Sequence, residues 1–332
     1  MRKDIKEIIT INDQKVCRIT TPDERFYGKE VKNPITGLPE IKWFPSSTWI
    51  KSYWYMSPYL LKWIADKGLT EADVIKKEAG LRGDKIHQAS EDIDKGLGIA
   101  IDAKYLNKER GEMEELTVEE IDAIKSYADF IDAEKPELIT NEMTVFSPEG
   151  SDEEYAGTLD RIFGFRTGNI RQIVILDIKS GQSVYKEMHI QVSSYSHADI
   201  DYQKLGITDE EWQNRKLAIL QVGYRKNKNG YKYTEIPDRY DLFKIAYQTW
   251  KEENPDSQPR QKDYPLVIQS QFRKPKEGPS PISEAPENNG KQQSDSQASG
   301  DSAQAPVAPK KRKGSANSNG AASSENNRGQ VV

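Results

Sequence analysis

The sequence predicts an α/β fold, a mixed β-sheet flanked by helices. Two kinds of segment support this prediction. In 117–133, apolar residues recur at the spacing of an amphipathic helix, behind a capping box formed by Thr117 and Glu120. Three shorter runs rich in apolar residues have the length of strands and span 137–147, 154–166 and 171–179. A sheet with helices on its faces buries the apolar sides of both kinds of element.

The folded part of the chain is expected to end well before residue 332. From about Gly278 the chain consists mostly of Ser, Asn, Gln, Pro, Gly and Ala, which bury too little surface to offset their conformational entropy. We therefore expect an N-terminal hairpin and loop over 1–45, a folded domain over 46–277 and a disordered tail over 278–332.

The first third of the chain contains three different patterns. Residues 5–20 predict a hairpin that turns near Asn12 and Asp13, and the Gly- and Pro-containing stretch 21–45 predicts loops. Residues 47–66 predict one helix whose aromatic side chains fill the core or stack on single-stranded bases. These side chains are Trp49, Tyr53, Trp54, Tyr55, Tyr59 and Trp63.

After the three predicted strands the chain contains a helix that carries Gln191, a hairpin over 215–236 and a helix over 238–253. Asn229-Gly230 predicts a two-residue turn in the hairpin. The hairpin is basic, and its cations are either solvated or contact a DNA backbone. They are Arg225, Lys226, Lys228 and Lys232.

Asp177 and Lys179 end the run 172–179, which has the composition of a strand. Because a strand has a side-chain period of two, both side chains lie on one face. Asp160 belongs to the preceding strand. Two carboxylates and one ammonium can hold a divalent cation, orient a water and offset developing charge, as metal-assisted phosphodiester hydrolysis requires. A solvated ion pair at a strand edge is the alternative.

Helices are also expected over 70–79 and 84–96, the second capped by Asp84. His87 and Glu91 are four residues apart on the second helix and share one side of it. They either join the aspartates around a cation or form a solvated pair. The apolar residues beside them predict a buried stripe of Ile86, Ala89, Ile93 and Leu97.

Three more polar residues are candidates for the same site. Glu142, in the strand 137–147, either adds a carboxylate to the site or supports a second metal, or it is an exposed strand residue. Gln191 and Tyr195 are four residues apart on a helix, where an amide and a phenol can bond phosphate oxygens or brace the lysine. An ordinary amphipathic helix is the alternative.

These motifs, taken in order, resemble the PD-(D/E)xK nuclease superfamily, and within it the RecB-type branch of phage exonucleases and the mitochondrial genome maintenance exonuclease. The segments 44–50 and 61–63 resemble the entry element of those members. The matching residues are Gly83, His87 and Glu91, then Gly157 and Asp160, then Asp177 and Lys179, and finally Gln191 and Tyr195.

The resemblance implies a restriction-endonuclease-like core that uses Mg²⁺ or Mn²⁺. It implies metal ligation by Asp160, Asp177 and the carbonyl of Ile178, with His87, and Glu91 or Glu142, completing the coordination shell or bridging to it through water. It implies that Lys179 positions the attacking water, while Gln191 and Tyr195 hold the lysine or the DNA strand. Some relatives carry a four-cysteine iron–sulfur cluster, which a chain with Cys17 alone cannot build.

The expected substrate is DNA, processed from a free end during recombination, replication or repair, with a recombination or single-strand-binding protein as a candidate partner. An endonuclease of the same fold, or a DNA-binding assembly factor without catalysis, are the alternatives. No helicase P-loop motif occurs in the chain.

The net charge of −5 argues against a broad DNA-coating surface but not against a narrow basic groove. No apolar run reaches membrane-spanning length and no signal peptide is evident, so we expect a cytoplasmic protein, in a bacterial host if phage-encoded. The basic cluster Lys310–Lys313 resembles a nuclear localisation signal, although a DNA tether or no role is the preferred interpretation.

Overall fold

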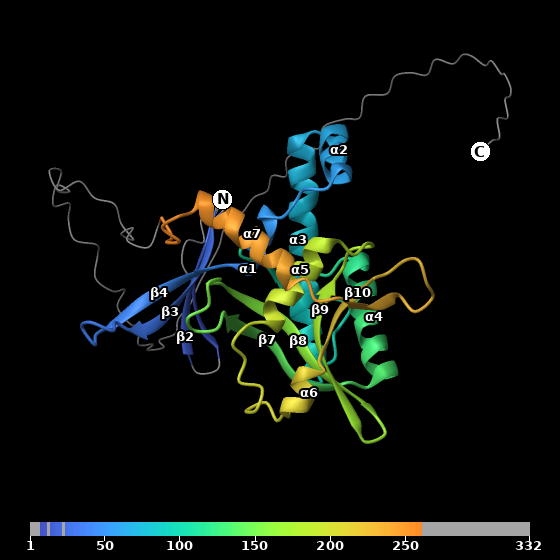
Figure 1. Cartoon of the computed structure of the whole chain (residues 1–332). Helices are drawn as coiled ribbons and strands as arrows, with labels where there is room; N and C mark the ends of the chain where they lie inside the picture. Colours follow the sequence, from blue (N-terminus) through green and yellow to red (C-terminus); the bar gives the residue numbers. More distant parts are fainter. Residues whose placement is uncertain (1–6, 12–13, 22–23, 261–332) are drawn as a thin grey trace, which may run out of the picture. The chain divides into compact units, whose positions relative to one another are not determined.

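The structure is a computed structural model that describes residues 7–11, 14–21 and 24–260, which belong to one compact unit (Figure 1). The predicted turn at Asn12 and Asp13, the disordered tail over 278–332 and the basic cluster Lys310–Lys313 lie outside the described residues.

A five-stranded mixed sheet forms the centre of this unit. Its strand order is β11-β10-β9-β8-β7, in which β9 and β10 are parallel and the other neighbours are antiparallel. The strands are β7 (Glu137–Phe146), β8 (Ala156–Thr167), β9 (Ile170–Lys179), β10 (Lys216–Val222) and β11 (Tyr231–Ile236). The three strands predicted over 137–179 and the hairpin over 215–236 are therefore confirmed.

Helices cover both faces of this sheet (Figure 1). Alternate residues of β9 take part in two separate cores: Val174 and Leu176 pack with α3 and α4, whereas Ile173 and Ile175 pack with α5 and α7. The fold class predicted from the sequence, an α/β structure with a helix-flanked mixed sheet, is confirmed. The helices are α3 (Leu69–Asp94), α4 (Val118–Glu134), α5 (Lys186–Ser196) and α7 (Tyr240–Glu253).

The N-terminal region forms an antiparallel sheet, so the loops predicted over 21–45 are wrong. The turn-forming residues Asn33 and Gly37 connect two long strands instead, with the Asn33 side chain accepting from the backbone N–H groups of Ile35 and Thr36. This sheet shares a buried core with α5 and α7. Its strands are β1 (Glu7–Ile11), β2 (Gln14–Thr20), β3 (Arg25–Lys32) and β4 (Pro39–Pro45).

The helix predicted over 47–66 is broken into three pieces. They are α1 (Ser47–Ile50), the 3₁₀ turn η1 (Lys51–Tyr53) and α2 (Pro58–Lys67). The break follows from the Ser57-Pro58 pair, because the Ser57 side chain caps α2 and Pro58 occupies its first turn. The aromatic residues divide accordingly: Trp49, Tyr53 and Trp54 pack against the core, whereas Tyr55 and Tyr59 are exposed.

The two helices predicted over 70–79 and 84–96 are one continuous helix, α3, so Asp84 is an interior residue and the predicted cap is wrong. Gly80 and Gly83 lie between the two predicted helices, and the continuous helix accommodates them because tertiary packing outweighs their low helix propensity. The predicted stripe is buried at Ile86 and Ala89, but Leu97 lies beyond the helix end and is exposed.

Three further elements were not predicted: β5 (Lys104–Asn107), β6 (Glu112–Glu115) and α6 (Asp209–Gln213). The loop between β10 and β11 spans residues 223–230, so the expected two-residue turn is wrong. The capping box of Thr117 and Glu120 is confirmed at the start of α4. Within the described residues, no helix combines the length and apolar character needed to cross a membrane.

Gly157 permits β8 to approach α5 closely, and this contact allows the packing between the two elements to be tested. A Cβ at Gly157 would lie 2.5 Å from Cε1 of the buried Tyr195. We predict that Gly157→Ala lowers the free energy of unfolding by about 1–3 kcal/mol through overpacking. Gly83→Ala is the control, because nothing lies near its Cβ, and its helical position predicts slight stabilisation. Urea denaturation of both variants measures the difference; equal stabilities would contradict the prediction.

Candidate functional site

The C-terminal end of β9 carries an ion pair between Asp177 and Lys179. The Lys179 Nζ lies 2.5 Å from Asp177 Oδ2, as the two-residue spacing predicts. The Asp177 side chain is almost fully buried, whereas that of Lys179 is partly exposed. Burial raises the pKa of Asp177, although Lys179 opposes this shift. The Lys179 pKa is also raised, because Asp177 and Asp160 outweigh the effect of burial.

Asp160 lies beside this pair on the neighbouring strand β8. The register of the two strands pairs Arg161 with Leu176, which brings the preceding Asp160 level with Asp177. Asp160 Oδ2 accepts a 2.7 Å hydrogen bond from the backbone N–H of Ile178. This bond fixes the orientation of the carboxylate and leaves its other oxygen for another partner.

His87, Glu142 and Asp160 converge on one point. Each offers one ligand atom, and these atoms lie within 4.8 Å of one another. His87 comes from α3, Glu142 from β7 and Asp160 from β8, so three elements meet here. A nitrogen and two carboxylate oxygens at this spacing suit a hard divalent cation.

The imidazole of His87 lies between two acceptors. Its Nδ1 is 3.4 Å from Glu142 Oε1, and its Nε2 is 3.3 Å from the Ile178 carbonyl oxygen. Burial alone would lower the His87 pKa, but the Asp160 and Glu142 carboxylates outweigh it and raise the pKa to about 9. Without a metal cation, His87 is therefore protonated at neutral pH, and it supplies part of the positive charge that offsets the carboxylates.

Glu142 adopts a backbone conformation that is rare outside glycine. Its φ of 46° lies in the left-handed region, although it is located within β7. Its carboxylate faces His87 and Arg161, and these cations lower its pKa against the effect of burial. Such strain persists only where the surrounding structure enforces it, and it is concentrated at functional sites.

A fully buried arginine supports the cluster from behind. Arg161 Nη1 donates to Glu142 Oε1 at 3.1 Å and to the Asp160 carbonyl oxygen at 2.7 Å. Its Nε lies 2.5 Å from Asp94 Oδ2, and its Nη2 donates to Ser90 Oγ on α3. Arg161 therefore ties α3 to β7 and β8 at the level of the cluster.

Helix α5 closes the other side of the Asp177–Lys179 pair. Gln191 Nε2 donates to Tyr195 Oη at 2.8 Å and lies 3.4 Å from Asp177 Oδ1. Burial raises the Tyr195 pKa well above its usual value, so the phenol stays neutral. Gln191 thus contacts the aspartate directly, whereas Tyr195 braces the amide of Gln191.

Lys51 on η1 is a second lysine of the site, and the sequence did not identify it. Its Nζ donates to Gln191 Oε1. Burial, together with the nearby Lys179, lowers the Lys51 pKa to about 8. The one available signal was its position directly after the segment 44–50, which resembles an entry element.

The predicted residues do not all reach the cluster. Glu91 lies one helical turn beyond His87, where it is 3.7 Å from Lys95 Nζ rather than among the three converging ligand atoms. Burial and the neighbouring Glu142 raise the Glu91 pKa. The Asp177 carboxylate also lies outside the three-residue group and faces Lys179. The Ile178 carbonyl, in contrast, lies against His87.

Comparisons with known proteins do not assign this site. No protein-family model matches the chain, and no curated protein matches it at a significant level. The assignment therefore depends on the chemistry of the residues themselves. Histidine nitrogen, carboxylate oxygens and a nearby backbone carbonyl fit Mg²⁺ or Mn²⁺. The described cysteine, Cys17, does not belong to this group and is buried in the core that the N-terminal sheet helps to form.

The raised His87 pKa predicts a pH-dependent contribution to stability in the metal-free protein. Because the folded pKa of about 9 exceeds the usual 6.5, the contribution is complete below pH 6.5 and is lost as the pH rises through 9. We expect the melting temperatures of the wild type and His87→Gln, measured with EDTA, to differ most near pH 6 and to converge above pH 9. A difference that does not change with pH would contradict this.

The buried pair of Arg161 and Asp94 predicts a large loss of stability when one partner is removed. Arg161→Met leaves Asp94 buried without its cation, and we expect a loss of about 3–5 kcal/mol in urea denaturation. The double variant Arg161→Met/Asp94→Leu is expected to lose less than the sum of its single variants. Simple additivity would show that the two side chains do not depend on each other.

Proposed function

We propose that this protein is a divalent-cation-dependent deoxyribonuclease. The observation that carries the proposal is the convergence of His87, Glu142 and Asp160 immediately beside the Asp177–Lys179 pair. Ligands for a hard cation and a lysine within one site are the groups needed to hydrolyse a phosphodiester. The resemblance of the motifs to PD-(D/E)xK nucleases supports the same reaction.

In the proposed mechanism, His87, Glu142 and Asp160 would hold Mg²⁺ or Mn²⁺, with the Ile178 carbonyl nearby. Asp177 orients Lys179 and is available to join the ligands. The bound cation supplies Lewis-acid stabilisation of the phosphate oxygens.

Lys179 hydrogen-bonds the water that attacks phosphorus and offsets the charge that develops on the phosphate. Attack in line with the leaving oxygen breaks the P–O3′ bond and leaves a 5′-phosphate and a 3′-hydroxyl. Gln191, which donates to Asp177, and Lys51, which donates to Gln191, bind the strand that carries the scissile group in this mechanism.

The proposed biological role is exonucleolytic processing of DNA ends in phage-type recombination, replication or repair. The resemblance to phage and mitochondrial exonucleases supports this choice over an endonuclease. A recombination or single-strand-binding protein is the proposed partner, and the cytoplasm, of a bacterial host if the protein is phage-encoded, is the proposed location.

A cleavage assay tests the proposal. We expect the wild type to degrade end-labelled linear single-stranded DNA with Mg²⁺ or Mn²⁺ but not with EDTA, and to spare circular DNA. Lys179→Ala and Asp160→Asn are each expected to lower the rate by more than about 100-fold, because each removes stabilisation of the transition state. Lys204→Ala, at an exposed surface pair, is the matched control and should retain full activity.

Other outcomes of this assay are equally informative. Cutting of circular DNA would change the assignment to an endonuclease. DNA binding without metal-dependent cutting, or full activity in Lys179→Ala, would overturn the proposal.

A further inference from the structure

A small polar cavity lies directly beyond the catalytic end of β9. Its volume is about 110 Å³, and Ser180, Gly181 and Gln182, which line it, follow Lys179 in the chain. Two guanidinium groups and one carboxylate also line it, those of Arg82, Arg225 and Glu119. The residue that follows the proposed catalytic lysine in the chain therefore already lines the cavity. The lining contains more cationic than anionic side chains.

The two arginines share a single carboxylate. Arg82 Nη1 lies 3.1 Å from Glu119 Oε2, and Arg225 Nη2 pairs with Glu119 Oε1. Two cations against one anion leave a net charge of +1. The side chains are 33%, 67% and 47% exposed for Arg82, Arg225 and Glu119, and ion pairs at such exposure are weak because water screens them. An incoming anion can therefore replace the carboxylate at little cost.

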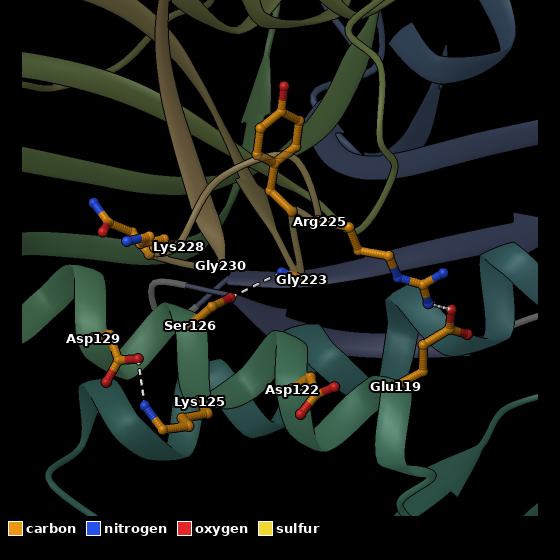
Figure 2. A pocket seen from close by; sticks show the side chains of 11 residues that line it. Glu119, Asp122, Lys125, Ser126, Asp129, Gly223, Arg225, Lys228 and Gly230 are labelled. Atoms are coloured by element: carbon orange, nitrogen blue, oxygen red, sulfur yellow. Dashed lines mark hydrogen bonds and ion pairs between the residues drawn. The ribbon is translucent and has the colours of Figure 1, made fainter.

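The backbone beneath the arginines is held firmly. Gln182 Nε2 donates to the Gly223 carbonyl oxygen at 2.8 Å, and Gln182 Oε1 accepts from the Arg225 backbone N–H. The Gly223 N–H donates to Ser126 Oγ on α4 at 2.9 Å, as Figure 2 shows. The hairpin base is thus joined to both the β9–α5 connection and α4, while the guanidinium of Arg225 reaches across to Glu119 (Figure 2).

The neighbouring cavity has a different character. It occupies about 260 Å³ over the exposed side of α4, where Asp122 and Asp129 line it together with Lys125 and Lys228. Lys125 is already paired with Asp129 at 2.5 Å (Figure 2). Arg225 and Glu119 line this cavity too, so its three carboxylates are matched by three cations, whereas two guanidinium groups against one carboxylate give the smaller cavity a net positive charge that favours a phosphate.

We propose that Arg82 and Arg225 form a second phosphate-binding subsite. It takes a backbone phosphate of the bound DNA strand that lies next to the scissile phosphate. Glu119 serves as a displaceable counter-ion that holds the two guanidinium groups together until DNA replaces it. This proposal rests on the proposed nuclease function, because its ligand is the strand that enters the site. Guanidinium groups favour such phosphates through paired, charge-assisted hydrogen bonds.

The subsite predicts opposite effects for its two kinds of residue. With a fluorescein-labelled single strand in EDTA, Arg82→Ala and Arg225→Ala should each weaken binding several-fold and reduce the slope of log K against log[salt] by about 0.7. Glu119→Gln frees both guanidinium groups and should strengthen binding. Arg166→Ala and Glu137→Gln are matched controls, because they alter a comparably exposed arginine–glutamate pair on β7 and β8 and should leave the affinity unchanged.

The subsite is refuted if Glu119→Gln binds DNA no more tightly than the wild type, or if the arginine variants behave like Arg166→Ala. Thermal melting of each variant identifies affinity losses that come from unfolding. Because binding is measured in EDTA, the outcome is separate from cleavage. If the wild type never cuts DNA but the variants show these shifts in binding, the nuclease proposal is refuted and the subsite stands. If the wild type cuts DNA but the variants bind it as the wild type does, the nuclease stands and the subsite is refuted.

Discussion

The accumulation of negative charge at one end of the central sheet is the constraint on which the site depends. Asp160 and Asp177 are buried on adjacent strands, and Glu142 converges on the same place. Carboxylates so close repel each other strongly in a low-dielectric environment. The protein offsets this repulsion with cations from separate elements, namely Arg161, His87, Lys179 and Lys51. In the proposed mechanism a divalent cation would take the place of the proton on His87, which would couple metal binding to deprotonation of the imidazole.

The parts of the site that depend on local periodicity could be predicted from the sequence. The period of two on β9 placed Asp177 and Lys179 together, and the helical period placed Gln191 above Tyr195. Lys51 could not be found this way, because it meets Gln191 across 140 residues of sequence and only through tertiary packing. Arg161 was equally hidden: an arginine in a strand is ordinarily exposed, and its burial follows from Asp94 on a helix that no local pattern connects to it.

Two errors in the predicted fold, the gap between two helices at 80–83 and the loops over 21–45, lie at glycines that the structure places inside regular elements. Gly80 and Gly83 are interior residues of α3, and Gly28 lies within β3. At Gly28, a Cβ would meet Ile41 and Trp43 at less than 3 Å, so the glycine permits close packing of β4 rather than a turn. Tertiary contact outweighs local propensity at each position, whereas the capping box of α4 was predicted correctly because its signal is local.

The most direct test of the central claim is the location of a bound cation. A crystal of the wild-type protein grown with Mn²⁺ and measured by anomalous scattering would show where the ion lies. We expect a peak between His87, Glu142 and Asp160, within about 2.0–2.3 Å of at least three ligand atoms. A saturating concentration of Mn²⁺ that leaves this position empty, with the three side chains in place, would contradict the account.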